Sequence, residues 1–372
     1  MPSRRSVLAT GISVLPTVIG GCASLPGLRD PDGADWSASV PEPGTLSPPV
    51  ATEGVVVAGG RRDDDIASGR LKAFDTETGE RQWEFDFGRM TGLTAADGTV
   101  YVGEKRGSNR ARILAFDART GDRRWTQRVA NLSSAMTVAN GTLYTANGGL
   151  AAIETDGGTI RWERSGVAET GFTVVAAPDD QLAADDHAVY FADADGVVAL
   201  STTDGTASWR WRPEQWEAPA VGPTPIGDAV YVGGGSDIVA LDEADATARW
   251  RTSFGRAAGV TGFHTTESSL LVAEGTDEAP SDTFGTVYEL SLKDGGERYE
   301  MRFDAPVTQT ASTATTFIVG TNDGTVEWTD GASFFEQFET TLPTGNYVLG
   351  GAGERAFAQT SEGTLWTLSP PA

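Results

Sequence analysis

A tandem repeat limits the possible folds of this chain more than any other feature of its sequence. The two clearest copies read AFDTETGERQW, from Ala73 to Trp83, and AFDARTGDRRW, from Ala115 to Trp125, and each follows a short β-branched segment. Alternating apolar residues predict strands, Asp-x-x-Thr-Gly predicts a tight turn, and the tryptophan supplies a large packing surface on the next strand. Each copy therefore predicts one antiparallel sheet. Such a sheet cannot bury both faces alone, so the copies must stack around an axis.

The aromatic residue that ends each copy sets the expected number of sheets. These residues are 37 to 49 positions apart, the length of a β-propeller blade, and they are Trp36, Trp83, Trp125, Trp162, Trp209, Trp250, Tyr299 and Phe338. The last copy, from Arg355 to Ser369, lacks its tryptophan, whereas Trp36 precedes the first complete copy. We therefore expect an all-β fold, an eight-bladed β-propeller closed by the N-terminal strand, which leaves no long sheet edge open. Seven blades follow if the copy ending at Phe338 is degenerate.

The pattern Ala-x-Asp-x-x-Thr-Gly-x-x-x-Trp resembles the tryptophan-docking motif of the pyrroloquinoline-quinone-repeat family, the quinoprotein-like β-propellers. The resemblance covers about residues 35 to 372, and it is most specific in the first two copies. Members of this family include quinone-dependent alcohol dehydrogenases and a lipoprotein that assists the assembly of outer-membrane barrels. In that family the motif is structural. The resemblance therefore implies fold roles rather than site roles for Asp75, Gly79, Trp83, Asp117, Gly121 and Trp125, and for Trp36, Trp162, Trp209 and Trp250.

The family resemblance leaves an enzyme and a binding module as competing interpretations. Quinone-dependent dehydrogenases typically place adjacent cysteines over the cofactor and bind calcium near a catalytic aspartate. Cys22 is the only cysteine of this chain, and no catalytic aspartate can be assigned by motif. We expect no catalytic residue, no cofactor and no metal site, and a monomer that binds a protein or envelope partner. The alternatives are a quinone-dependent dehydrogenase-like protein and a binder of carbohydrate or another small ligand in the propeller channel.

The N-terminus resembles an export signal. Arg4 and Arg5 precede an apolar stretch, as in twin-arginine signals, and Val18 to Ala23 resembles a lipobox in which Cys22 receives the lipid. We expect a signal over residues 1–22, a flexible tether over residues 23–34 and the propeller over residues 35–372. A diacylglyceryl group on Cys22 supplies the two chains that stable anchoring needs. The expected location is the outer face of the cell membrane.

The charge composition excludes one class of partner and indicates a saline environment. A net charge of -24 argues against nucleic acid, because phosphate binding needs clustered cations. Only Lys72, Lys105 and Lys293 are lysines, although 28 residues are basic. An acidic, lysine-poor composition resembles that of proteins from salt-adapted archaea, in which salt screens the repulsion among carboxylates.

Three further groups of residues each carry two interpretations. Clustered acids at 63–65, 179–180 and 185–186 could hold calcium, but they lack calcium-loop spacing and are typical of solvated loops. His187 and His264 lack the companions that zinc or a catalytic triad requires. Trp211, Arg212 and Trp216 depart from the repeat and form a possible partner patch, because aromatic residues and arginine are enriched in binding hot spots. Local packing between sheets is the competing explanation for this patch.

Overall fold

The structure is a computed structural model in which most of the chain after residue 30 is described. The described residues are 31, 33–40, 48–62, 65–105, 111–129, 135–146, 149–165, 182–193, 196–213, 219–254, 259–266, 268–275, 285–313, 316–329, 338–343 and 346–369. Their regular secondary structure consists of β-strands. None of these residues forms a helix able to span a lipid bilayer.

The first half of the chain forms a seven-stranded sheet and two four-stranded sheets, all antiparallel. The large sheet contains β2 (Val50–Thr52), β3 (Val55–Arg62), β4 (Asp65–Asp75), β5 (Arg81–Ala96), β6 (Thr99–Lys105), β7 (Ala111–Asp117) and β8 (Arg123–Val129). The next sheet contains β9 (Met136–Ala139), β10 (Thr142–Ala146), β11 (Gly149–Glu154) and β12 (Ile160–Ser165). The third contains β13 (Leu182–Ala184), β14 (Ala188–Asp193), β15 (Gly196–Ser201) and β16 (Ala207–Trp211).

The second half forms four-stranded antiparallel sheets, the last of which also takes a strand from the N-terminus. The first of them contains β17 (Pro219–Ile226), β18 (Ala229–Gly234), β19 (Asp237–Asp242) and β20 (Ala248–Ser253). The second contains β21 (Gly259–Thr265), β22 (Ser269–Gly275), β23 (Gly285–Ser291) and β24 (Glu297–Phe303). The third contains β25 (Val307–Ser312), β26 (Phe317–Thr321), β27 (Thr325–Thr329) and β28 (Phe338–Thr341). The last joins β29 (Tyr347–Ala352), β30 (Arg355–Thr360) and β31 (Thr364–Leu368) to β1 (Ala34–Ser39).

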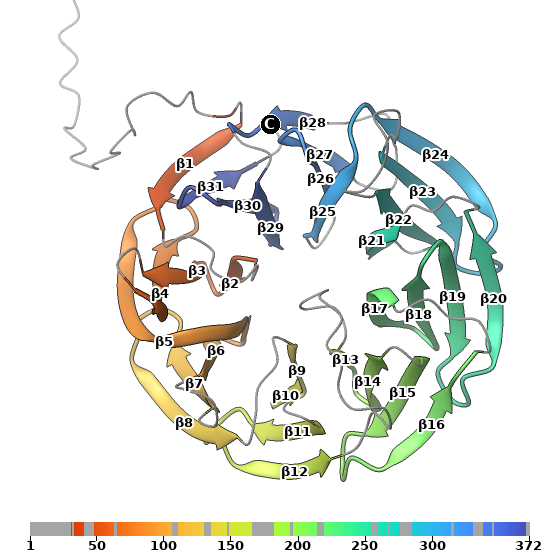
Figure 1. Ribbon diagram of the computed structural model, residues 1–372, viewed down its shortest axis with the longest axis horizontal. Coiled ribbons are helices and arrows are strands. Elements are labelled where there is room, and N and C mark those ends of the chain that lie inside the picture. The colour runs from red at the N-terminus through yellow and green to blue at the C-terminus, as the bar shows by residue number, and fades with distance from the viewer. Residues whose placement is uncertain are drawn as a thin grey trace, which may run out of the picture.

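The sheets are arranged radially around a central axis, as expected for a β-propeller (Figure 1). Strands β9, β13, β17, β21, β25 and β29 lie nearest the axis, whereas β8, β12, β16, β20 and β24 lie on the perimeter (Figure 1). The long strand β5 explains the seven-stranded sheet. Its first half pairs with β4 and its second half, from Arg89 to Ala96, pairs with β6. The expectation of an all-β fold built from antiparallel sheets is confirmed.

The two ends of the described chain meet in one sheet. β1 pairs antiparallel with β31, and Trp36 lies opposite Thr367 in that register. Asp35 forms an ion pair with Arg355 and accepts a hydrogen bond from Ser369 at 2.7 Å. The first and last described strands are thereby joined by backbone and side-chain bonds, beside each other in Figure 1.

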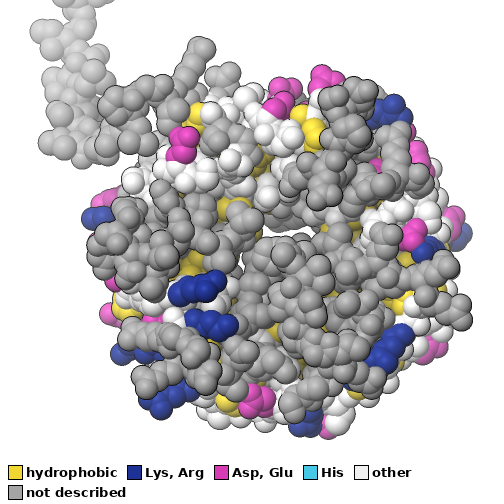
Figure 2. All heavy atoms as spheres, viewed as in Figure 1, with side chains coloured by type: hydrophobic (Ala, Val, Ile, Leu, Met, Phe, Trp, Pro, Cys, Tyr) yellow, Lys and Arg dark blue, Asp and Glu magenta, His cyan; other side chains and the backbone are white. Residues whose placement is uncertain are grey.

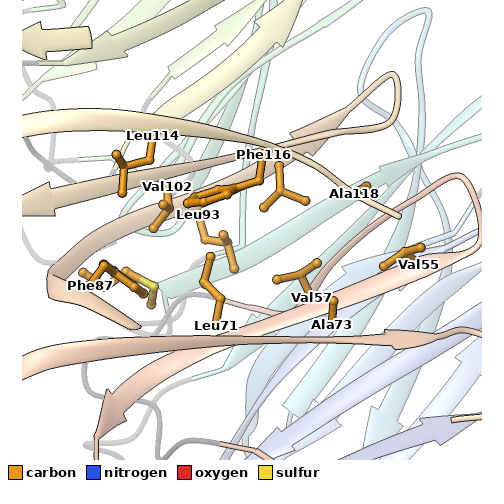
Figure 3. Packing of buried hydrophobic residues seen from close by; sticks show 12 residues of the cluster. Val55, Val57, Leu71, Ala73, Phe87, Leu93, Val102, Leu114, Phe116 and Ala118 are labelled. Atoms are coloured by element: carbon orange, nitrogen blue, oxygen red, sulfur yellow. The ribbon is translucent and has the colours of Figure 1, made fainter. Parts of the chain in front are cut away.

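Hydrophobic packing between neighbouring sheets forms the core. Val57 and Leu71, from β3 and β4, face Leu93, Val102 and Phe116, from β5, β6 and β7 (Figure 3). All of them are buried. Burying a side chain of this size stabilises a fold by about 1.5–3 kcal/mol. The β-branched alternation that predicts strands therefore also supplies the contact between one sheet and the next.

Six tryptophans of the repeat each dock on a turn of the following repeat. The indole Nε1 of each donates a hydrogen bond to a backbone carbonyl there: Trp36 to Thr76 (3.1 Å), Trp83 to Ala118 (2.7 Å), Trp125 to Thr155 (2.6 Å), Trp162 to Thr202 (3.0 Å), Trp209 to Glu243 (2.7 Å) and Trp250 to Leu292 (3.0 Å). These bonds satisfy the one polar atom of a large apolar side chain, which lets it pack against the next sheet.

The turn that receives Trp83 uses both the aspartate and the glycine of the repeat. Oδ1 of Asp117 accepts hydrogen bonds from the amides of Arg119 and Thr120, both at 3.0 Å. Gly121 has a φ of 73°, in the left-handed region that glycine adopts most readily. A Cβ on Gly121 would lie 2.6 Å from the Trp83 ring. Glycine therefore allows both the turn conformation and the close approach of the indole.

Ala246 occupies the glycine position in the turn beneath Trp209, with a φ of 62°. We expect Ala246→Gly to raise the free energy of unfolding by about 0.5 kcal/mol, because relief of the left-handed strain exceeds the extra entropy of the unfolded glycine. Urea unfolding at constant salt measures the change. An unchanged or lower midpoint would show that the alanine methyl group contributes packing that outweighs its strain.

Candidate binding sites of the ring

A cavity lies among the strands nearest the central axis (Figure 1). Its volume is about 340 Å³, and strands β13, β17, β21 and β25 contribute its lining. The lining combines apolar groups, such as Leu182 and Phe263, with the hydroxyl groups of Thr224, Thr310 and Ser312. None of the described lining residues is charged. This cavity can accommodate a neutral ligand that combines apolar surface with hydrogen-bonding groups.

The chemistry of this cavity does not fit a calcium-bound anionic quinone. Calcium requires several oxygen ligands, usually with carboxylates among them, and a quinone carboxylate requires cationic or amide partners. The described part of the chain contains no cluster of three or more His, Cys, Asp or Glu side chains placed to hold a metal. No step of quinone chemistry can therefore be assigned to the residues seen here.

The patch predicted around Trp211 is only partly described. Trp211 ends β16, is half-buried and packs with Trp209 against the apolar core formed by strands β14, β15, β18 and β19. Arg212 follows it and is exposed, whereas Trp216 lies outside the described residues. The position of Trp211 favours local packing, the competing explanation, for that residue. Cys22, Arg4 and Arg5 also lie outside the described residues.

The two histidines lie apart, on different sheets. His264, on β21, stacks on Phe317 with ring centroids 5.8 Å apart, and burial lowers its pKa. His187 is exposed in the turn before β14, where its amide donates to Asp185 Oδ1 at 2.7 Å. Asp185 also accepts the hydroxyl hydrogen bond of Tyr190 at 2.9 Å. This part of the acidic sequence shapes a turn, whereas the acids at 63–64 and 179–180 lie outside the described residues.

Sequence reasoning missed a recurrent arginine beside the docking tryptophan. Arg124 donates to Asp117 Oδ2 at 2.8 Å and also binds the Thr99 hydroxyl. The hydrogen bond from Arg124 is the largest cause of lowering the pKa of Asp117 to about 2. Arg161 binds Glu154 at 3.3 Å in the same way, and also the Thr142 hydroxyl at 3.0 Å.

The repeat ending in Trp250 contains the most extensive version of this pair. Arg249 donates to Asp242 Oδ2 at 2.7 Å and to Asp228 Oδ1 at 2.6 Å. In each case the arginine immediately precedes the tryptophan and the acid stands seven positions before the arginine. That spacing is visible in the sequence and could have identified the pair.

Glu327 carries an unusual charge environment on β27. It lies directly opposite Glu339 of β28 and is half-buried. Burial, followed by the carboxylates of Glu339 and Asp304, raises the pKa of Glu327 to about 7. Like charges opposite each other across a sheet are destabilising.

Replacing Glu327 by glutamine should stabilise the protein above neutral pH. Because the folded-state pKa of Glu327 lies above its ordinary value, the stability associated with its proton is present at low pH and is lost as the pH rises through about 7. We expect Glu327→Gln to add about 1–2 kcal/mol at pH 8, allowing for partial solvent screening, and at most a quarter of that at pH 5. Melting temperatures across pH 5–8 measure this difference. An equal gain at both pH values would show that charge is not the cause.

Comparisons with known proteins agree with the repeat and the ring. The family described as outer membrane protein assembly factor BamB matches residues 67–211 and 109–276 of this chain. The outer membrane protein assembly factor BamB of Moranella endobia (strain PCIT) is 26% identical over 183 residues, which cover 44% of this chain and 43% of that protein. The chain thus matches less than half the length of this curated relative.

Solved structures show the same fold over almost the whole chain. The crystal structure of BamB from Moraxella catarrhalis has a TM-score of 0.68 at 17% identity, covering 90% of this chain and 99% of that one. Quinohemoprotein alcohol dehydrogenase ADHIIG from Pseudomonas putida HK5 has a TM-score of 0.65 at 14% identity, covering 91% and 77%. At these low sequence identities, the structural similarities establish only that the fold is a propeller. With residues 67–276 matched by its profile, more than half of its length, this chain belongs to the BamB family of repeat propellers.

Proposed function

We propose that this protein is a non-catalytic binding or scaffolding module that holds a protein or envelope partner at the outer face of the cell membrane. The observation that carries the proposal is the membership of the chain in a family described as outer membrane protein assembly factor. Lipid on Cys22 would anchor the ring, and Arg4 and Arg5 would direct its export. The partner is left open as an envelope component, because an assembly role at an outer membrane applies only in cells that have one.

We also infer that the ring has eight blades and is closed by its N-terminal strand. Support comes from the strand pairing, in which the two halves of β5 belong to two successive blades. The pairing of β1 with β31 supports closure, because it joins the chain ends within one sheet. A ring joined in this way leaves no long sheet edge for unintended pairing, which suits a rigid platform.

The alternative function is that of an enzyme, a quinone-dependent dehydrogenase. The likeness to ADHIIG supports it at the level of fold, but fold does not imply function. The described residues that line the cavity near the central axis are uncharged, which weighs against it. The same cavity supports a different second function, the binding of a neutral small ligand or carbohydrate.

One preparation separates these functions. The full-length protein is extracted from membranes in high salt, captured, and examined by mass spectrometry and by absorption spectroscopy on the same sample. A stoichiometric protein partner without a chromophore supports the scaffold, whereas a bound quinone chromophore overturns it. A bound neutral metabolite without a protein partner supports the channel ligand instead.

One substitution tests the proposed membrane anchor separately from the fold. Cys22→Ser removes the thiol that would carry the lipid and changes nothing in the described ring. The variant should move from the membrane fraction to the soluble exported fraction while keeping its melting temperature. Retention in the membrane fraction would contradict the anchor.

A further inference from the structure

The first complete repeat keeps the acid of the arginine pair but lacks the arginine. The acid of the first complete repeat is Asp75, and the residue seven positions later, just before Trp83, is Gln82. In the repeat ending in Trp209, Ser201 and Ser208 replace both members of the pair. The first repeat therefore differs from its neighbours by having an anionic group in this place without the cation that binds it elsewhere.

The carboxylate of Asp75 is oriented as in the paired repeats. Its Oδ1 accepts hydrogen bonds from the amides of Glu77 at 3.0 Å and Thr78 at 2.9 Å, as Oδ1 of Asp117 does in its own turn. In the paired repeat, Oδ2 of Asp117 binds the guanidinium. No described residue donates a hydrogen bond to Oδ2 of Asp75.

A cavity of about 330 Å³ lies beside this carboxylate. Asp75, Gln82 and Val55 line it, and Val55 stands opposite Asp75 where Thr99 stands opposite Asp117. The space that Arg124 and the Thr99 hydroxyl occupy in the second repeat is therefore an open cavity in the first repeat.

The charge of the cavity favours a cation. Glu53, Asp75 and Glu77 contribute carboxylates, and Arg119 is the one basic residue among its described lining. The guanidinium of Arg119 pairs with Glu53 at 3.5 Å and comes from the neighbouring repeat. The hydrogen bond from the Thr78 amide is the largest cause of the lowered pKa of Asp75. Arg355 also lowers this pKa through space, but its guanidinium is itself paired with Asp35.

We propose that this cavity binds the guanidinium group of an arginine on the partner protein. The inference rests on the proposed scaffold function and names one chemical feature of the partner. The protein itself supplies the precedent, because Arg124, Arg161 and Arg249 place guanidinium groups against the corresponding acids. A planar guanidinium can bind Oδ2 of Asp75 while its remaining donors reach other oxygens of the cavity.

A peptide titration tests the cavity without the partner. Acetyl-Gly-Arg-Gly-amide is added to the isotope-labelled protein, and backbone amide shifts of Gly54 and Thr76 are followed at the lowest salt at which the protein stays folded. We expect saturable shifts at millimolar peptide, and none at the same concentrations with acetyl-Gly-Gln-Gly-amide. Equal shifts with both peptides, or none with either, overturn the proposal.

A variant that fills the cavity with an arginine of the protein itself gives the strongest test. Gln82→Arg should rebuild the pair seen in the second repeat, weaken peptide binding at least tenfold and melt no lower than the wild type. Ser208→Arg adds the same charge at the same repeat position, where Ser201 replaces the acid, and should bind the peptide as the wild type does. Unchanged binding by Gln82→Arg would overturn the proposal.

The titration and the capture experiment can fail separately. A captured partner with no peptide binding would reject the cavity and leave the scaffold function standing. Peptide binding that Gln82→Arg abolishes, with no captured partner, would reject the scaffold function and leave a guanidinium site.

Discussion

Replacing Gly121 by valine is expected to lower the free energy of unfolding by about 2–5 kcal/mol, more than any other single substitution considered for the ring. Two effects add. The residue has a φ of 73°, where a β-branched side chain is strained by about 1–2 kcal/mol. A Cβ there would also lie 2.6 Å from the Trp83 ring, so the indole must move away from a surface on which it packs, at about 1–3 kcal/mol.

Gly227 separates the two effects because it shares the backbone strain without the neighbour. Its φ is 62°, and no atom lies within 4 Å of a Cβ built on it. Gly227→Val should therefore lose only about 1–2 kcal/mol. The comparison is made by urea unfolding in one buffer. Equal losses at the two glycines would show that docking of Trp83 contributes nothing beyond the turn conformation.

A double substitution checks the assignment to Trp83. If the indole is the cause, Gly121→Val should be less destabilising in a Trp83→Ala background, because the overlapping ring is absent. The difference between the two backgrounds is the interaction free energy of a double-mutant cycle, expected at about 1–3 kcal/mol. Strict additivity would contradict direct contact between the two positions.

The repeat could be predicted from sequence because its chemistry is local. An aspartate that binds the amides two and three residues later, a glycine with positive φ and a nearby tryptophan all act within one short segment, as the turn from Asp117 to Gly121 shows. Patterns of this kind determine the backbone conformation through contacts within a few residues. The sequence therefore suffices for the antiparallel sheets and for the turns that receive the tryptophans.

Features that depend on register or on neighbouring sheets could not be predicted in this way. Glu327 and Glu339 lie opposite each other only because β27 and β28 pair in one particular register. The sequence of neither strand predicts that register. The half-burial of Trp211 depends on the strands of the next sheet. The missing arginine at Gln82 is visible in the sequence, but the cavity beside Asp75 is recognised only in three dimensions.

Salt should change the stability of this protein more than most substitutions do. The chain has 52 acidic and 28 basic residues, and Figure 2 shows acidic and basic side chains spaced around the rim of one face. Salt has two opposing effects on such a surface. It weakens exposed ion pairs such as Arg249 with Asp228, and it screens the repulsion among the excess carboxylates.

The excess of acids decides which effect dominates. With a net charge of -24, screening of repulsion should exceed the loss of ion pairs, and the melting temperature should fall by more than about 10 °C when NaCl is lowered from 2 M to 0.05 M. Calorimetry at constant pH measures the fall. An unchanged melting temperature would contradict both this balance and the saline environment inferred from composition.

Protons provide an independent check on the same balance, because they remove charge where salt only screens it. Glu327, with its pKa raised to about 7, becomes protonated when the pH is lowered from 8 to 6. Protonation removes the cost of burying the charge, which salt does not screen, and also the repulsion from Glu339 and Asp304, which salt does screen. The stability recovered between pH 8 and pH 6 should therefore be larger in 0.05 M NaCl than in 2 M NaCl, where only the burial part remains. Equal recovery at the two salt concentrations would indicate that a particular ion, rather than general repulsion among carboxylates, causes the salt dependence.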